Sequence, residues 1–257
     1  MGKNKLIRFA EMAHFSNTYE FPENIAGTWH KEVFKNDNPI CLELACGRGE
    51  YTVGLSAMHP ERNYIGVDIK GARLWRGAKT CMEEGRNNAA FMRAYIDQIS
   101  KYFAKDEVDE IWITFPDPHL QPGKARKRLT SWRYLRQYTG LVKDGGTIHL
   151  KTDDPLLYHF TVAVVENLNL PLIEKTENIN QTHADHAELG IRTTYETKWR
   201  SEGKPIHYIA FKLDHSKLAE ENYKKAEAAM MAWLAEHNPA REDLDAIRAA
   251  EARQTKK

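Results

Sequence analysis

The regular alternation of strand-like and helix-like segments constrains the fold of this 257-residue chain more than any other feature. Short runs rich in apolar and β-branched residues recur at 40–45, 64–67, 89–92, 108–115, 147–151, 172–176 and 206–213. Residues with helical spacing fall at 50–58, 70–84, about 130–138 and 155–167, with a shorter piece before residue 103. Strands that alternate with helices pack as a largely parallel sheet covered on both faces. We therefore predict an α/β fold with a doubly wound, mostly parallel sheet of seven strands.

Composition divides the chain into three parts. Residues 1–38 form a polar and aromatic N-terminal arm, which either packs over the core or touches a polyanion. Residues 39–213 hold the α/β domain, in which Asp144-Gly145-Gly146 is expected to be a turn. Residues 214–257 carry Ala, Glu, Lys and Arg at helical spacing and predict a C-terminal helical tail, which is split at Asn238-Pro239.

The overall composition argues against several classes of function. No stretch approaches about 18 consecutive apolar residues, so no membrane-spanning helix is expected. Cys41, Cys46 and Cys81 lack metal-type spacing and indicate reduced thiols of a cytoplasmic protein. His183 and His186 have no third ligand in view, so no metal site is predicted. The net charge is only +1, so evidence for a nucleic-acid partner must come from a local surface.

The first predicted strand runs into a glycine turn and then a helix, over the sequence Leu42-Glu43-Leu44-Ala45-Cys46-Gly47-Arg48-Gly49. Gly47 and Gly49 let the backbone approach a ligand closely. The dinucleotide fingerprint needs a third glycine where this chain has Thr52, which disfavours NAD. Glu43 lies inside the strand, where a carboxylate would repel a pyrophosphate but could accept hydrogen bonds from a cationic amino-acid ligand.

Two further acids follow the next strands. Asp68 ends the second strand, where a carboxylate can bind both hydroxyls of a ribose. Asp97 follows the third strand and either reaches an adenine or is an acid at a helix N-terminus. A ligand with an amino-acid part, a nucleoside part and no phosphate describes S-adenosylmethionine. An ordinary turn with an ordinary ion pair is the alternative for the glycines and Glu43.

Asp117 stands between two prolines directly after the strand at 108–115. The prolines stiffen the loop and hold this acid at the carboxyl end of a strand, where open α/β sheets bind ligands. From Pro118 to Lys143 there is no acidic residue, and the basic residues are Lys124, Arg126, Lys127, Arg128, Arg133, Arg136 and Lys143. This basic segment predicts contact with an RNA backbone, and a solvated helix face is the alternative.

Six motifs occur in order between residues 38 and 213: Glu43 to Gly49, Ile65-Gly66-Val67-Asp68, Phe115-Pro116-Asp117-Pro118, Lys127-Arg128-Leu129-Thr130, Lys151-Thr152-Asp153 and Thr193-Thr194-Tyr195-Glu196. Together they resemble the bacterial-type tRNA (guanine-N7-)-methyltransferases. The resemblance implies a Rossmann-like class I methyltransferase fold. It also implies transfer of a methyl group from S-adenosylmethionine to N7 of a guanine in the tRNA variable loop.

The resemblance also implies roles for individual residues. Asp117 would be catalytic, and Glu43, Gly47, Gly49, Asp68 and Asp97 would bind the cofactor. The guanine would be held by Gln121, Asp153, Thr193, Thr194, Tyr195 and Glu196, and RNA phosphates by Lys124, Arg126, Lys127 and Arg128. The chain departs from the family pattern at His119, where the family has Trp, at Gln121, where it has Lys, and at Ala94-Tyr95, where it has an acid.

Two other functions are compatible with the sequence. A methyltransferase of the same fold could act on another RNA base or on a small molecule, although a small-molecule enzyme would not need the basic segment. A non-catalytic RNA-binding module could keep the fold, although the glycine turn, Asp68 and Asp117 argue for catalysis. The sequence leaves open whether the protein is a monomer or a homodimer.

Overall fold

The structure is a computed structural model and describes residues 3–237. Its strands are β1 (Thr18–Glu20), β2 (Ile40–Leu44), β3 (Asn63–Asp68), β4 (Ala89–Arg93), β5 (Val108–Thr114), β6 (Val142–Thr152), β7 (Leu172–Thr176) and β8 (His207–Lys212). Its α-helices are α1 (Lys3–Met12), α2 (Glu50–Met58), α3 (Gly71–Glu83), α4 (Trp132–Tyr138), α5 (Pro155–Asn167), α6 (Ile179–Thr182), α7 (Thr194–Ser201) and α8 (Glu220–His237). Four shorter helical segments are η1 (Trp29–Phe34), η2 (Ile96–Lys101), η3 (Pro122–Lys127) and η4 (His215–Leu218).

The eight strands form one sheet in the order β1-β4-β3-β2-β5-β6-β8-β7. Strands β1 to β6 pair in parallel, whereas β8 runs antiparallel to both β6 and β7. The chain builds outward from β2 through β3 to β4 and then returns to place β5 on the other side of β2. The strand order therefore reverses between β2 and β5, and open α/β sheets bind their ligands beside such a reversal.

Alternate residues of the central strands face different helices. Ile40, Leu42 and Leu44 of β2 pack into the main core, which includes residues of α4, α5 and α8. Cys41 faces the opposite way and packs with Tyr51 and Leu55 of α2. All five residues of β2 are buried, as expected for a parallel strand covered on both faces. This alternation aims the side chain of Glu43 at α2.

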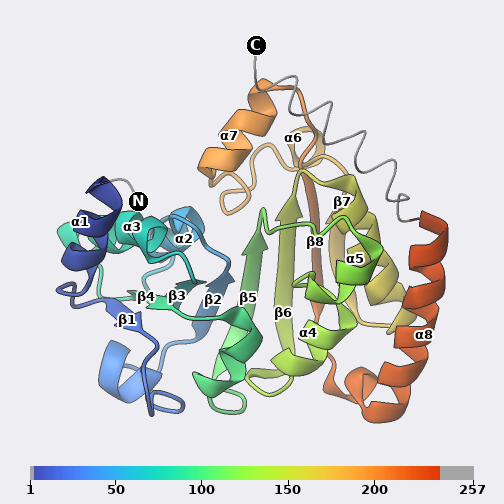
Figure 1. Cartoon of the computed structure of the whole chain (residues 1–257), viewed down its shortest axis with the longest axis horizontal. Helices are drawn as coiled ribbons and strands as arrows, with labels where there is room; N and C mark the ends of the chain where they lie inside the picture. Colours follow the sequence, from blue (N-terminus) through green and yellow to red (C-terminus); the bar gives the residue numbers. More distant parts are fainter. Residues whose placement is uncertain (1–2, 238–257) are drawn as a thin grey trace.

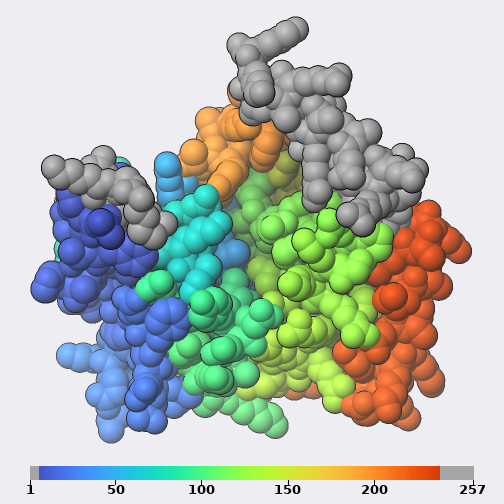
Figure 2. Space-filling model, viewed as in Figure 1, coloured from blue at the N-terminus to red at the C-terminus, as the bar shows by residue number. Residues whose placement is uncertain are grey.

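The two halves of the chain lie side by side, with the blue-to-cyan half on the left of Figure 2 and the green-to-red half on the right. Helices α1, α2 and α3 gather beside β3 and β4, and α8 runs along α4 and α5 (Figure 1). Helix α7 lies beyond the carboxyl ends of β5 and β6 (Figure 1). It therefore stands over the edge of the sheet where the predicted site residues follow their strands.

The predicted mostly parallel sheet with helices on both faces is confirmed, with two differences in detail. The sheet has an eighth strand, because the three residues of β1 pair with β4. The expected turn at Asp144-Gly145-Gly146 lies inside β6. The ladder continues there because Gly145 N–H donates to Leu213 O at 2.8 Å. The helical prediction for residues 215–237 holds as η4 and α8, and the rest of the predicted tail lies outside the described residues.

Candidate active site

The site lies where the chain leaves β2 and β5. Ala45 and Phe115 directly follow these neighbouring strands, and both adopt left-handed backbone conformations, with φ of 58° and 49°. Such conformations are unfavourable for residues with a Cβ and are concentrated at functional sites. The sharp turns send the glycine turn and the Asp117 loop across the carboxyl edge of the sheet.

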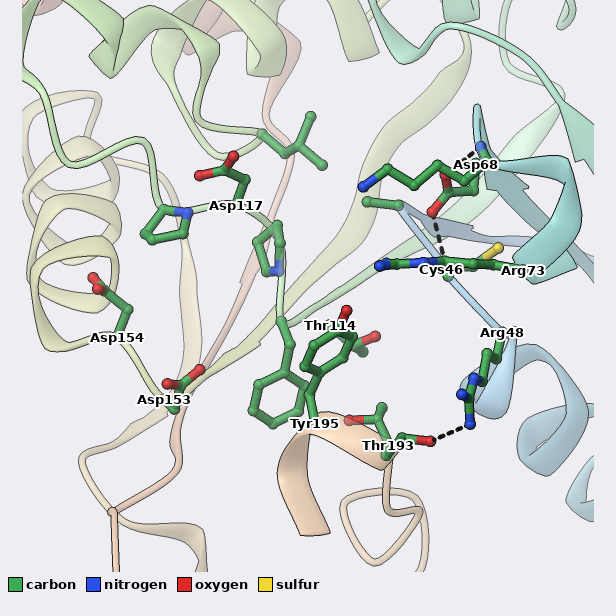
Figure 3. A pocket seen from close by; sticks show the side chains of 18 of the residues that line it. Cys46, Arg48, Asp68, Arg73, Thr114, Asp117, Asp153, Asp154, Thr193 and Tyr195 are labelled. Atoms are coloured by element: carbon green, nitrogen blue, oxygen red, sulfur yellow. Dashed lines mark hydrogen bonds between the residues drawn. The ribbon is translucent and has the colours of Figure 1, made fainter. Parts of the chain in front are cut away.

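A cavity of about 1890 Å³ opens at this edge. The predicted site residues that line it are Gly47, Asp68, Asp97, Asp117, Lys127, Asp153, Thr193, Thr194 and Tyr195. The predicted residues outside its lining are Glu43, Gly49, Gln121, Lys124, Arg126, Arg128 and Glu196. Figure 3 shows Asp117, Asp153 and Asp154 on one side of the cavity and Asp68, Arg48 and Arg73 on the other. The structure therefore brings the predicted cofactor and substrate ends together around one space.

The two glycines of the turn have different environments. A Cβ on Gly47 would meet no atom within 4 Å, whereas a Cβ on Gly49 would lie 2.4 Å from Cε1 of Phe91. Both residues have positive φ, so both positions favour glycine. Gly47 is thus open toward the cavity, while Gly49 permits close packing of the turn against β4.

Asp68 fixes the glycine turn. Its Oδ2 accepts a hydrogen bond from Gly47 N–H at 2.9 Å, and its Oδ1 accepts one from Lys70 N–H at 2.7 Å. Each carboxylate oxygen can accept a further hydrogen bond. Asp68 therefore braces the turn and keeps acceptor capacity at the cavity wall.

Glu43 lies behind the wall, with its carboxylate joined to two neighbouring elements. Oε2 accepts hydrogen bonds from the N–H and the hydroxyl of Thr52, at 2.8 and 2.7 Å, and Oε1 accepts one from the Thr114 hydroxyl at 3.1 Å. Burial raises the pKa of Glu43 to about 7. Thr52 is the residue that replaces the third glycine of a dinucleotide motif. Glu43 and Thr52 thus support the cavity wall from behind. This geometry does not show direct contact between Glu43 and a cofactor.

A buried arginine, Arg128, holds the Asp117 loop through hydrogen bonds to the loop backbone. Arg128 is fully buried, and it donates hydrogen bonds to Pro118 O at 2.9 Å and His119 O at 3.1 Å. Its guanidinium also lies 4.4 Å from the ring centre of Phe160. Burial lowers the pKa of Arg128 to about 10, so the side chain stays charged at neutral pH. The structure thus gives Arg128 a supporting contact with the Asp117 loop, and its contact with RNA phosphate stays a prediction.

Asp117 itself is open, with 74% of its side chain exposed. Its Oδ1 accepts a hydrogen bond from His119 N–H at 3.0 Å and lies 3.6 Å from His119 Nδ1. Burial lowers the pKa of His119, which keeps the imidazole neutral at neutral pH. The carboxylate of Asp117 thus lies beside a neutral imidazole.

Acids from distant segments neutralise much of the basic segment. Arg126 pairs with Glu227 and Arg136 with Glu220, both from α8. Arg133 Nη2 lies 3.5 Å from Asp97 Oδ1, and Lys143 pairs with Asp109. Of the four predicted RNA contacts, Lys124 and Lys127 are exposed and form no ion pair with a described carboxylate. The segment contains no acidic residue in the sequence, but acids from other segments lie beside it in the structure.

Asp97 lines the cavity and is also linked to α4. Its Oδ1 accepts a hydrogen bond from the Tyr134 hydroxyl at 2.5 Å. The neighbouring Tyr95, where the family pattern has an acid, is 54% exposed and contacts the ring of Phe21. Both predicted roles of Asp97, adenine contact and helix-terminal acid, fit its position in the first turn of η2. Gln121 is the residue before η3 and lies outside the cavity lining.

The four residues of the Thr193-to-Glu196 motif begin α7 and divide into two groups. Thr193 Oγ1 caps the helix by accepting from Glu196 N–H at 3.0 Å, and the Thr194 hydroxyl donates to Glu50 Oε1 at 2.8 Å. These threonines and Tyr195 line the cavity. Glu196 is fully buried, with its Oε2 2.6 Å from Lys151 Nζ and its Oε1 2.7 Å from Arg200 Nε. Glu196 therefore holds the motif in place, and the prediction that it binds guanine is not supported by this arrangement.

Sequence reasoning did not single out Arg48 and Lys151. Arg48 Nη1 donates to Thr194 Oγ1 at 3.2 Å and so ties the glycine turn to α7. Lys151 Nζ donates to the Tyr51 hydroxyl and to Leu189 O, both at 2.8 Å. The sequence feature that could identify Lys151 is its place beside Asp153 in the Lys-Thr-Asp motif. Because this lysine falls in a predicted buried strand, it needs a buried partner.

None of the helices within residues 3–237 combines the length and the apolar character that a membrane-spanning helix needs. Within the same range, no three His, Cys, Asp or Glu side chains lie close enough together to hold a metal ion. His183 instead pairs with Glu174.

Comparisons with known proteins place the chain among methyltransferases. Residues 37–210 match the model of a family described as "Putative methyltransferase". A tRNA (guanine-N(7)-)-methyltransferase of Bacteroides fragilis is 47% identical over 221 residues, which cover 83% of this chain and 87% of that protein. A protein of the same name from Porphyromonas gingivalis is 51% identical over 190 residues, covering 74% and 77%.

Solved structures show the same fold at low sequence identity. The 16S rRNA methyltransferase KamB superposes with a TM-score of 0.56 at 11% identity, covering 75% of this chain and 95% of that one. A 30S ribosomal A1408 methyltransferase from an uncultured bacterium gives 0.54 at 15% identity, covering 76% and 98%. The expected class I methyltransferase fold is therefore confirmed.

Proposed function

This chain belongs to the tRNA (guanine-N(7)-)-methyltransferase family, and we propose that it transfers a methyl group from S-adenosylmethionine to N7 of a guanine in tRNA. The arrangement that carries the proposal is the cavity at the β2–β5 reversal, where Asp68 and Asp117 face one space. A guanine in the variable loop of a cytoplasmic tRNA is the substrate that the family motifs favour.

The residues of the cavity fit S-adenosylmethionine. The open position beside Gly47 and the acceptor capacity of Asp68 suit a nucleoside. A pyrophosphate site would need a third glycine at position 52, where Thr52 instead bonds to the buried Glu43. When bound, this compound supplies an electrophilic methyl group on a sulfonium. Asp68 would hold the ribose, and Gly47 would allow the close approach of the backbone.

The chemistry needs orientation more than proton transfer. Guanine N7 carries a lone pair and no proton, so no strong general base is required. Correct placement of the two reactants can lower the barrier by roughly 7–11 kcal/mol. The guanine gains positive charge as its N7–C bond forms, and a nearby carboxylate stabilises that charge. Asp117, which is exposed on its stiffened loop beside a neutral His119, would take this role.

Recognition of guanine would fall to the residues on the α7 side of the cavity. Guanine presents N1–H and N2–H donors, which adenine lacks at these positions. Asp153 follows β6 and lines the cavity, and burial raises its pKa. Its carboxylate can accept from the guanine edge, while Thr193 and Thr194 offer hydroxyls nearby. Glu196 acts by holding these residues in place.

The experiment that tests the proposal compares two transcripts of one tRNA. The first carries guanosine at the target position, and the second carries 7-deazaguanosine, in which carbon replaces N7. Transfer of labelled methyl to the first transcript alone supports the proposal. Equal labelling of both would show that another atom is methylated.

A further inference from the structure

Five exposed cations form a rim on one side of the cavity. We call them the α1–α3 rim: Arg8 of α1, Arg48 of the glycine turn, and Lys70, Arg73 and Arg76 at the start of α3. Among the side chains that the structure describes, no carboxylate forms an ion pair with any of the five. Arg8 instead lies over the ring of Trp75, and Arg73 lies over the ring of Tyr195. Arg48 donates a hydrogen bond to the hydroxyl of Thr194.

The rim differs in this respect from the basic segment. There, Arg126, Arg133, Arg136 and Lys143 each have a carboxylate partner, and Arg128 is buried. An arginine already paired with a carboxylate must give up that partner to bind a phosphate. The rim cations have no such partner, so phosphate binding costs them less. The rim is therefore the better polyanion surface, although its charges are scattered over 69 positions of the sequence, from 8 to 76.

The proposed cofactor does not account for the rim. S-adenosylmethionine has no phosphate, and its single carboxylate needs one cation. The cavity, at about 1890 Å³, also exceeds the roughly 300–1,000 Å³ of most small-molecule pockets. The positive charge of the rim and the large volume of the cavity both favour a second, anionic occupant.

The two sides of the cavity differ in charge. Asp117, Asp153 and Asp154 lie on one side, and the exposed Arg48 and Arg73 lie on the other (Figure 3). Asp68 shares the second side, but it is buried and its oxygens already accept from two backbone N–H groups. Phosphates are repelled by the first side and attracted by the second. A base that acquires positive charge during methylation is stabilised by the first side. One nucleotide spanning the cavity satisfies both.

We infer that the α1–α3 rim binds backbone phosphates of the RNA substrate next to the target guanine, whose base crosses the cavity to the acidic side. This inference rests on the proposed function and names the surface that the substrate uses. Lys127, which lines the cavity, and the exposed Lys124 three residues earlier extend the phosphate contacts beyond the rim.

The test compares two double variants that remove the same charge. Arg8→Gln with Arg76→Gln changes the rim, and Arg136→Gln with Lys143→Gln changes two cations of the basic segment that already have carboxylate partners. The dissociation constant for one unmodified tRNA transcript is measured at several salt concentrations. Affinity for S-adenosylmethionine is measured separately by calorimetry, to show that each variant keeps an intact cofactor site.

The rim variant is expected to bind tRNA more weakly and to lower the slope of log K against log salt by about 1.4, since each single-strand phosphate contributes about 0.7. The matched variant is expected to keep the slope of the parent. A parental slope in the rim variant, or an equal loss in both variants, would overturn the inference. If the parent binds tRNA but forms no 7-methylguanosine, the proposed function fails instead, and the slopes still decide where phosphates bind.

Discussion

The ammonium group of Lys151 lies 2.6 Å from a carboxylate oxygen of Glu196, and neither side chain is exposed to solvent. Lys151 lies on β6, two residues before Asp153. Glu196 ends the Thr-Thr-Tyr-Glu motif at the start of α7. The pair therefore links two motifs that are 42 residues apart and places Asp153 and Thr193 beside the same cavity. Each buried charge depends on the other, because an unpaired charge in the interior is costly.

Breaking this pair should destabilise the protein. Lys151→Met leaves the Glu196 carboxylate with Arg200 alone, and we expect it to lower the free energy of unfolding by roughly 3–5 kcal/mol. Adding Glu196→Gln should recover part of the loss. Urea unfolding measures both, with Lys198→Met as a control, since that exposed pair with Glu202 contributes about 0–1 kcal/mol. Strictly additive losses for the two buried substitutions would contradict the account.

Asp117→Asn should reduce turnover and leave substrate binding largely intact. The substitution keeps the shape of the side chain but removes the charge that stabilises the methylated guanine. Loss of one such electrostatic contact typically costs about 10²–10³-fold in kcat. Single-turnover methylation and tRNA titration separate the two effects. If the variant methylates as fast as the parent, Asp117 has no part in the mechanism.

Arg128→Gln should affect the catalytic loop without changing the phosphate contacts. It removes the hydrogen bonds to Pro118 O and His119 O, so we expect kcat to fall while the salt slope of tRNA binding stays parental. Lys127→Gln is the matched control, and losing that exposed cation should lower the slope by about 0.7.

Should Arg128→Gln fail to fold, Arg128→Lys keeps the charge but not the forked geometry of the guanidinium. A lower slope in either Arg128 variant would mean that this side chain reaches RNA after all.

Glu43 should make stability depend on pH. Its pKa is about 7 in the folded protein against an ordinary value of 4.5, so between these values the folded state holds a proton that the unfolded state has lost. Stability should therefore fall as pH rises from about 4.5 to about 7, by at most about 3 kcal/mol. Glu43→Gln removes this contribution and can keep the contacts to Thr52 and Thr114. Between pH 5 and pH 8, the unfolding free energy of the parent should fall more than that of the variant. An equal fall in both proteins would contradict the assignment.

Local patterns were enough to predict most of the fold. The β2 strand, the glycine turn and α2 are contiguous in sequence, and Asp68 and Asp117 follow strands whose apolar runs are easily recognised. The β1 strand escapes prediction because three residues give too little pattern. The break at Gly145 predicts a turn because glycine marks both turns and irregular strands.

The partners of charged residues could not be predicted in the same way. Arg126 pairs with Glu227, which is 101 residues away, so the basic segment looked unbalanced in sequence. Burial of Arg128 and Glu196 likewise depends on distant residues, because Arg128 packs on Phe160 of α5 and Glu196 pairs with Lys151 of β6. Sequence patterns located the site but could not separate the residues that line it from those that support it.

The most direct measurement is nucleoside analysis of bulk tRNA after incubation with the protein and methyl-labelled S-adenosylmethionine. The account predicts that the label appears in 7-methylguanosine, and that tRNA already carrying this modification takes up little. Label in any other nucleoside, or no transfer to tRNA by a protein that binds both compounds, would contradict it.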